Sequence, residues 1–190
     1  MRSPIQPAIV MFVLLSLVTG VAYPLVVTLG ANTLFPQKAT GSLLREGDRN
    51  VGSELLGQSF DDPQYFWGRP SATGPVPYNG LGGSGSNQAT TNPALVDAVR
   101  DRVARLREAD PGNQSSIPVD LVTASASGLD PHISPAAAQY QMSRVARVRH
   151  LSLNQIEALI NQHIEQPTFG VLGQPRVHVL KLNLALNSAK

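Results

Sequence analysis

Side chains of the kinds used in nucleophilic catalysis come together in one short stretch of the sequence, which contains Ser125, Ser127, Asp130 and His132. A serine, a histidine and an acid activate a hydroxyl group when the fold holds them in hydrogen-bond contact with one another. Neighbours within a turn rarely make those contacts, so we interpret the stretch as a turn ahead of a helix and predict no catalytic residue. A membrane-anchored extracytoplasmic hydrolase that uses Ser125 and His132 is the alternative.

The sequence lacks the spacing of a metal site. His150, His163 and His178 are scattered, without the Glu-x-x-His or His-x-x-x-His intervals that place ligands on one helix face, and the chain has no cysteine. Asp120 is expected at an exposed or capping position. We therefore predict no metal site and assign no cofactor to this chain.

A long segment between residues 68 and 92 is rich in Gly, Pro, Ser and Thr. Loops of this length in a compact domain are usually functional or disordered. Gly80, Gly82, Gly83 and Gly85 could expose backbone amides to a phosphate group. Neither a Gly-Lys-Ser/Thr ending nor a Rossmann spacing accompanies them, so we predict an ordered surface loop. A chaperone that binds nucleotide directly through this loop is kept as an alternative.

Aromatic and cationic side chains cluster directly before that loop, at Tyr65, Phe66, Trp67 and Arg69. Trp, Tyr and Arg dominate the binding energy of protein interfaces, which makes Tyr65, Trp67 and Arg69 candidates for a partner-binding surface. A structural role, with Arg69 bonded to loop carbonyls, is the competing interpretation.

An apolar run at the N-terminus would hold all of these residues at a membrane surface. No side chain from Ser3 to Gln37 is charged, and Ala8 to Leu29 is long enough for a helix to cross the roughly 30 Å hydrocarbon core of a bilayer. We predict a single membrane span. A cleavable signal peptide would use Arg2 as its basic start and Val18-Thr19-Gly20 as its cut site, but the apolar run continues beyond it. A buried core helix is the third interpretation.

Three positions in the predicted span are candidates for helix packing. Ser16 and Gly20 lie four residues apart, a spacing that lets a second helix approach closely. Pro24 removes a backbone donor and should kink the helix, which membrane spans tolerate when neighbouring helices satisfy the freed carbonyl.

Charge distribution excludes some classes of partner and leaves the orientation open. A net charge of +2 forms no basic stripe, so we expect no nucleic-acid partner. The charge rule for membrane topology is not decisive, because Arg2 precedes the span while Lys38, Arg45 and Arg49 follow it.

Three helices of the soluble part are predicted from start signals in which a polar side chain can cap the first turn. They run from Asn92-Pro93 to Asp110-Pro111-Gly112, from Ser134-Pro135 to about Arg149, and from the Ser152/Gln155 capping box to near Gln166-Pro167.

Strands are predicted at Val177 to Leu182, at Val119 to Thr123, and once or twice between Gly41 and Phe60. The fold class is therefore α+β. Residues 1–35 form the tail and transmembrane helix, and residues 36–190 form one soluble domain with a small sheet and about three helices.

Several segments together resemble the C subunit of the bacterial Kdp potassium-transporting ATPase, and the resemblance covers essentially the whole chain. They are TGVAYPL, GSLLREG, LLGQSF, YFWGRPSATG with PYN, GGSGSN, the run from Val119 to Arg149, and GQPRVHVLKLNLAL. Met142-Ser143 departs from the aliphatic-Pro pair usual in the family, which does not affect the assignment.

The resemblance implies a non-enzymatic accessory subunit of a potassium import complex in a bacterial inner membrane. Its partners would be the P-type ATPase catalytic subunit, a potassium-channel-like subunit, a small single-span subunit and the lipid bilayer. The assembly would use ATP, Mg²⁺ and K⁺. The soluble domain would be extracytoplasmic, and the subunit would act as a catalytic chaperone that raises the ATP affinity of the pump subunit.

Overall fold

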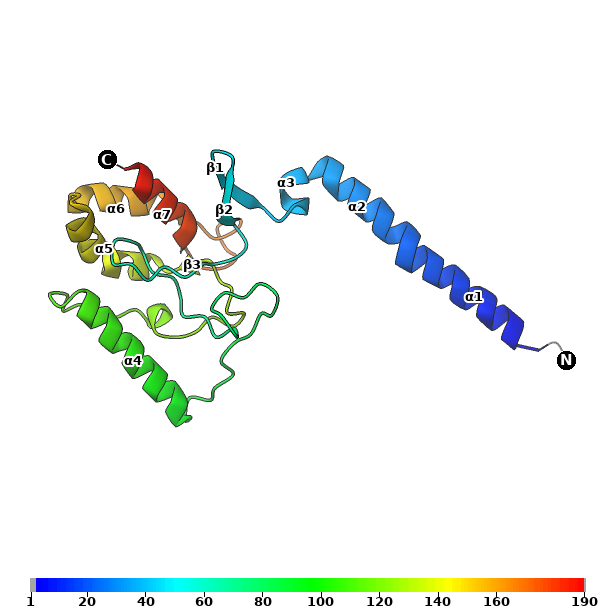
Figure 1. Ribbon diagram of the computed structural model, residues 1–190, viewed down its shortest axis with the longest axis horizontal. Coiled ribbons are helices and arrows are strands. Elements are labelled where there is room, and N and C mark those ends of the chain that lie inside the picture. The colour runs from blue at the N-terminus through cyan, green and yellow to red at the C-terminus, as the bar shows by residue number, and fades with distance from the viewer. Residues whose placement is uncertain (1–2, 190) are drawn as a thin grey trace. The chain divides into compact units, whose positions relative to one another are not determined.

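The structure, a computed structural model, describes residues 3–189; Arg2, the basic residue of the predicted tail, lies outside them. The chain forms two compact units, Met1–Val51 and Gly52–Lys190. Figure 1 shows the elements of both. Helices and small antiparallel sheets occur together, which confirms the predicted α+β class.

The first unit contains a helical rod of 30 residues, Ile5–Leu34 (Figure 1). It consists of α1 (Ile5–Leu17), a π-helical turn (Val18–Ala22) and α2 (Tyr23–Leu34). Its most apolar window has a mean hydropathy of 2.4 and buries none of its residues against the rest of the protein. Within residues 3–189 it is the single helix long and apolar enough to span a membrane.

The π-helical turn lies directly before Pro24. The N–H of Tyr23 donates to the carbonyl of Val18, five residues back rather than four, and the Thr19 hydroxyl donates to the carbonyl of Leu15 at 2.7 Å. In a regular α-helix the ring of Pro24 would crowd the carbonyl of Gly20 and leave it without a donor. The wider turn is therefore the local change that accompanies the proline, as at other helix irregularities.

After the short helix α3 (Pro36–Ala39), the chain forms a hairpin of β1 (Leu43–Glu46) and β2 (Arg49–Ser53), as predicted for this region. Gly47 begins the two-residue connection with φ +61, a conformation that glycine adopts without strain.

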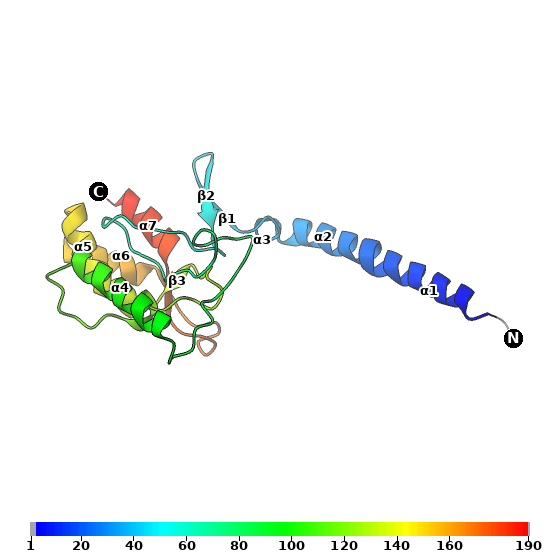
Figure 2. The same ribbon diagram turned by 60° about the horizontal axis from the view of Figure 1, so that its bottom comes forward.

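The described part of the second unit, residues 52–189, has four α-helices where about three helices were predicted: α4 (Pro93–Ala109), α5 (Pro135–Arg149), α6 (Leu153–Gln162) and α7 (Val179–Ser188). Helix α6 packs beside both α5 and α7, and the last turn of α4 contributes Leu106 to their core (Figures 1 and 2). A three-stranded antiparallel sheet has the order β3 (His132–Ile133), β5 (Arg176–His178), β4 (Ile164–Glu165).

The predicted start signals are confirmed for three helices. Asn92 accepts from the N–H of Ala94, Ser134 from that of Ala137, and Ser152 forms a capping box with Gln155. The predicted end of α6 near Gln166-Pro167 is wrong. The helix ends at Gln162 because Ile164 and Glu165 pair with β5.

One strand prediction is wrong, and a second is confirmed only at its start. The segment Val119 to Thr123 contains a 3₁₀ turn, Val119–Leu121. The C-terminal strand stops at His178, whose imidazole caps α7 by accepting from the N–H of Lys181. Val179, Leu182 and Leu186 are all buried, so the apolar residues that alternate like a strand also follow the 3.6-residue period of a helix.

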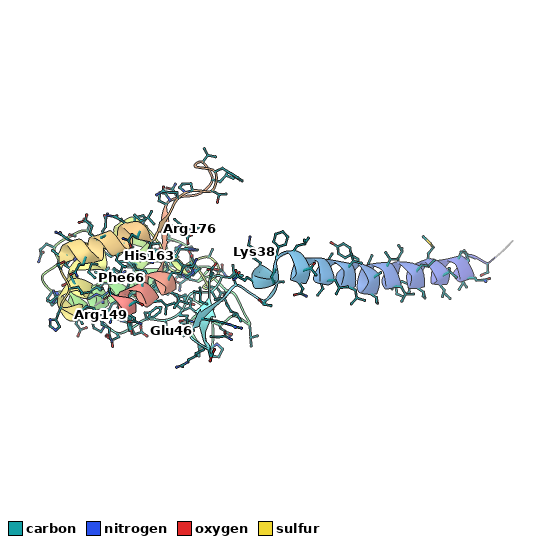
Figure 3. The ribbon with its side chains drawn as sticks, turned by 90° about the horizontal axis from the view of Figure 1, so that it is seen from above. Lys38, Glu46, Phe66, Arg149, His163 and Arg176 are labelled. Atoms are coloured by element: carbon teal, nitrogen blue, oxygen red, sulfur yellow. The ribbon has the colours of Figure 1, made fainter. Side chains whose placement is uncertain are left out.

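An irregular segment, Asp62 to Trp67, leads from the surface into the core, where Phe66, marked in Figure 3, is bonded to α7 and Trp67 to α5. Its backbone pairs with side-chain amides instead of a neighbouring strand. Asn183 accepts from the N–H of Phe66 at 2.9 Å and donates to its carbonyl at 3.0 Å. Gln141 does the same for Trp67, at 2.8 and 3.1 Å.

We predict that Gln141→Leu lowers the free energy of unfolding by about 2–5 kcal/mol, because it leaves the N–H and carbonyl of Trp67 buried without partners. Urea denaturation of the full chain in detergent, followed by fluorescence of the single tryptophan, measures the change. Gln139→Leu, an exposed position on the same helix, is the control and should stay within about 0.5 kcal/mol of the unmodified protein. Equal effects of both substitutions would contradict the role of Gln141.

Candidate partner-binding site

A pocket of the second unit lies beside Trp67 and has a volume of about 230 Å³. The segment around residues 59–71 forms one wall and α4 the other. Its chemistry is set by the guanidinium groups of Arg69, Arg102 and Arg105, opposed by one carboxylate, Asp61. The lining is therefore mainly cationic, and its aromatic residues are Phe60, Trp67 and Tyr78.

Trp67 is held in place by two arginines and a backbone bond. The guanidinium carbon of Arg144 lies 4.4 Å from the ring centroid and that of Arg105 lies 4.9 Å from it. The indole N–H donates to the carbonyl of Asp62 at 3.0 Å. Residue Trp67 is 9% exposed, so a partner would reach it through the pocket and past Arg105.

Arg144 is itself buried and carries part of the core. It donates to the carbonyls of Pro63 and Tyr65, and at 2.7 Å to the side chain of Gln141. Desolvation by burial lowers the pKa of Arg144 to about 10, which leaves the group charged at neutral pH.

Two of the three arginines that line the pocket, Arg102 and Arg105, come from α4. The guanidinium of Arg105 pairs with Asp61 at the rim, where both side chains are mostly exposed. Arg102 donates to the carbonyl of Val122 at 2.8 Å, and desolvation lowers its pKa. Arg105 is thus the cation most accessible to a partner.

Arg69 connects the pocket to the long loop. Its guanidinium donates to the carbonyl of Ala124 and pairs with Asp130, both at 3.3 Å. Its own carbonyl accepts from the Tyr78 hydroxyl at 2.5 Å. Burial, reinforced by the charge of Asp130, raises the pKa of Tyr78 to about 12, so the phenol stays protonated.

The glycines of the loop allow its backbone to approach residues 126–128. The N–H of Ser84 donates to the carbonyl of Ser127 at 2.8 Å, and a Cβ at Gly85 would lie 2.7 Å from the carbonyl oxygen of Ala126. The N–H of Gly82 is already bonded to the carbonyl of Asn79. Close backbone packing thus accounts for Gly85, whereas a Cβ at Gly82 would meet nothing within 4 Å.

The structure does not bring together Ser125 and His132, the nucleophile and base of the alternative hydrolase. Ser125 is 3% exposed, and its N–H donates to the carbonyl of Pro70. The imidazole of His132 lies 3.3 Å from Asp130 and 3.6 Å from Glu165, and no hydrogen bond joins it to Ser125 within residues 3–189. Hydrogen bonds from His132 outweigh the effect of burial and lower the pKa of Asp130.

Two other polar residues of the sequence analysis, Asp120 and His178, also have hydrogen-bond partners. Asp120 accepts from both the N–H and the hydroxyl of Ser134, the capping role expected for it. His178 reaches the carbonyl of Glu54 at 3.1 Å and lies edge-on to His132, and desolvation lowers its pKa. Among the residues that the structure describes, no group of three or more His, Asp or Glu side chains could hold a metal ion.

The other candidates lie outside the pocket. Tyr65 is half-buried, with Arg149 over its ring at 4.8 Å. Ser16, Gly20 and Pro24 are exposed along the rod, and a Cβ at Gly20 would meet nothing within 4 Å. The roles of Gln141, Arg144 and Arg102 were not predicted from the sequence. Gln141 and Arg144 lie on the buried face of the helix 135–149, and polar residues at such positions indicate buried hydrogen bonds.

Comparison with known proteins identifies the family. The family model described as "KdpC: K+-transporting ATPase, c chain" matches residues 5–188. A relative from Polaromonas naphthalenivorans (strain CJ2), named potassium-transporting ATPase KdpC subunit, is 60% identical over 190 residues, covering 100% of this chain and 97% of the relative. Proteins of the same name from Variovorax paradoxus (strain S110) and Herpetosiphon aurantiacus are 59% and 56% identical, with 100% of this chain and 98% of each relative covered. The chain therefore belongs to the KdpC family, the c chains of K⁺-transporting ATPases.

Proposed function

We propose that this protein is a non-catalytic accessory subunit of an ATP-driven potassium import complex, which it stabilises and modulates. The observation that carries the proposal is the family match over residues 5–188, which includes both the apolar rod and the soluble unit. Relatives covered over nearly their whole length are named as KdpC subunits of potassium-transporting ATPases.

The proposed partners are the P-type catalytic subunit, the potassium-channel-like subunit and the small single-span subunit of the Kdp complex. ATP, Mg²⁺ and K⁺ would be handled by those subunits. The disposition of Ser125 and His132 supports this division of labour, because they are not arranged for nucleophilic catalysis.

The proposed localisation is the bacterial inner membrane. Residues 1–35 would provide the tail and the single membrane span, and residues 36–190 an extracytoplasmic domain. A catalytic chaperone in this orientation would raise the ATP affinity of the pump subunit from the opposite side of the membrane. The effect would have to pass through packed helices as a coupling free energy, without direct contact to ATP.

Two surfaces are proposed to contact partners. Ser16, Gly20 and Pro24 would pack against another membrane helix, supported by the open space around Gly20. Trp67 and Arg69 would contribute to a second contact at the arginine-lined pocket, where Arg105 is mostly exposed, and Tyr65, outside the pocket, would belong to the same partner-binding surface. The cationic lining favours an acidic segment of a partner.

Two measurements on the assembled complex test the proposal. Affinity purification of the tagged chain from a detergent extract should bring down the other pump subunits, and recovery without them would overturn the assignment. Protease added to intact spheroplasts should digest the soluble domain. Digestion only after lysis would place that domain in the cytoplasm and overturn the proposed orientation.

Gly20→Leu is predicted to weaken assembly by about 1–2 kcal/mol, a roughly 5- to 30-fold loss of affinity, because the larger side chain prevents close helix approach. Retention of the other subunits during detergent size-exclusion chromatography measures it. Gly30→Leu makes the same change elsewhere in the rod and should retain the complex. Loss with both variants, or with neither, argues against a specific contact at Gly20.

Arg105→Glu is predicted to reduce the recovery of partner subunits about fivefold or more, because it reverses the most exposed positive charge of the pocket. Arg100→Glu is a matched control on the same helix, since Arg100 also forms an exposed ion pair, with Asp97. Equal recovery of both variants in quantitative co-purification would contradict a partner contact at the pocket.

A further inference from the structure

A second feature of the soluble unit has no role in the pocket or in the core. The loop between β4 and β5 carries three neighbouring apolar side chains that face solvent: Phe169 is 89% exposed, Val171 79% and Leu172 61%. Figure 3 shows this loop projecting from the rest of its unit beyond Arg176. We call these three residues the β4–β5 tip.

The tip has a defined backbone. Thr168 and Leu172 exchange both of their N–H to carbonyl bonds, at 2.9 and 3.0 Å. The N–H of Gly170 donates to the carbonyl of Pro167 at 2.9 Å. At the base, Glu165 pairs with Arg176 across the two strands at 3.0 Å. The three apolar side chains are therefore displayed in fixed directions, at a low entropic cost for binding.

The conformation at the tip is unfavourable for its sequence. Phe169 has φ +56, in the left-handed region that aromatic residues rarely adopt, and Gly170 follows with φ +76. A residue held in such a conformation while exposing a large apolar ring to water gains nothing for the fold. This combination indicates that the ring is placed for contact with another molecule.

We infer that the β4–β5 tip docks into an apolar recess on another protein subunit of the pump. This rests on the proposed function, since it requires a complex. A protein recess is favoured over the lipid surface for two reasons. No charged, Trp or Tyr side chain occurs from Gln166 to Pro175, whereas interfacial membrane segments use them. A recess also benefits from fixed side-chain directions, which a fluid bilayer does not.

Site-specific photocrosslinking in the assembled pump tests the contact. The photoreactive residue p-benzoylphenylalanine, placed at position 169, should form an adduct with another subunit. The same residue at position 81 is the control, because Leu81 is 99% exposed in a different loop. Adducts at position 169 with lipid, with a second copy of this chain or with nothing would each overturn the inference.

Substitution gives an independent measurement. Phe169→Ser should raise the rate at which the chain dissociates from the complex by at least about tenfold, as expected for a central apolar contact. Leu81→Ser should leave that rate unchanged. An unchanged melting temperature of the Phe169→Ser chain in detergent shows that the fold is intact, and unchanged dissociation then overturns the inference.

The two failures are distinguishable. If the unmodified chain recovers no other subunit, the proposed function fails. If the unmodified chain assembles but position 169 forms no adduct with another subunit, the inference about the tip fails and the proposed function stands.

Discussion

The second unit depends on one set of hydrogen bonds, those made by an irregular stretch of backbone, Asp62 to Trp67, which enters the core at its last two residues, Phe66 and Trp67. Buried backbone groups without partners are costly, and this stretch has no neighbouring strand. Gln141 and Asn183 act as that missing strand, each pairing with both polar groups of one residue. Arg144 binds two more carbonyls of the stretch. Two helices far apart in sequence are thereby joined to one segment.

The same arrangement determines what the pocket offers to a partner. Gln141 fixes the backbone of Trp67, and the indole ring contacts two guanidinium groups, that of the buried Arg144 and that of the mostly exposed Arg105. An aromatic ring with an exposed cation beside it is suited to binding protein groups. The tryptophan is thus part of the core and also lines the pocket, and its role in binding a partner stays a prediction.

The chain has two kinds of surface, that of the apolar rod and that of the second unit. The rod is apolar over its whole length and leaves none of its most apolar window buried, which suits a lipid environment or the helices of other subunits. The second unit has a hydrophobic core, and the arginine-lined pocket and the β4–β5 tip lie at its surface. This distribution is what an assembly subunit without its own chemistry requires.

The sequence by itself determined the features that depend on neighbouring residues. The apolar run specified the rod, and Asn92, Ser134 and Ser152 specified three helix starts, because a cap needs only its own first turn. Tertiary structure decided the rest. Residues 179–182 fit either a strand or a helix, and burial of Leu182 and Leu186 selected the helix. The partners of Phe66 and Trp67 lie more than 70 positions away, since long-range pairing leaves no local pattern to read.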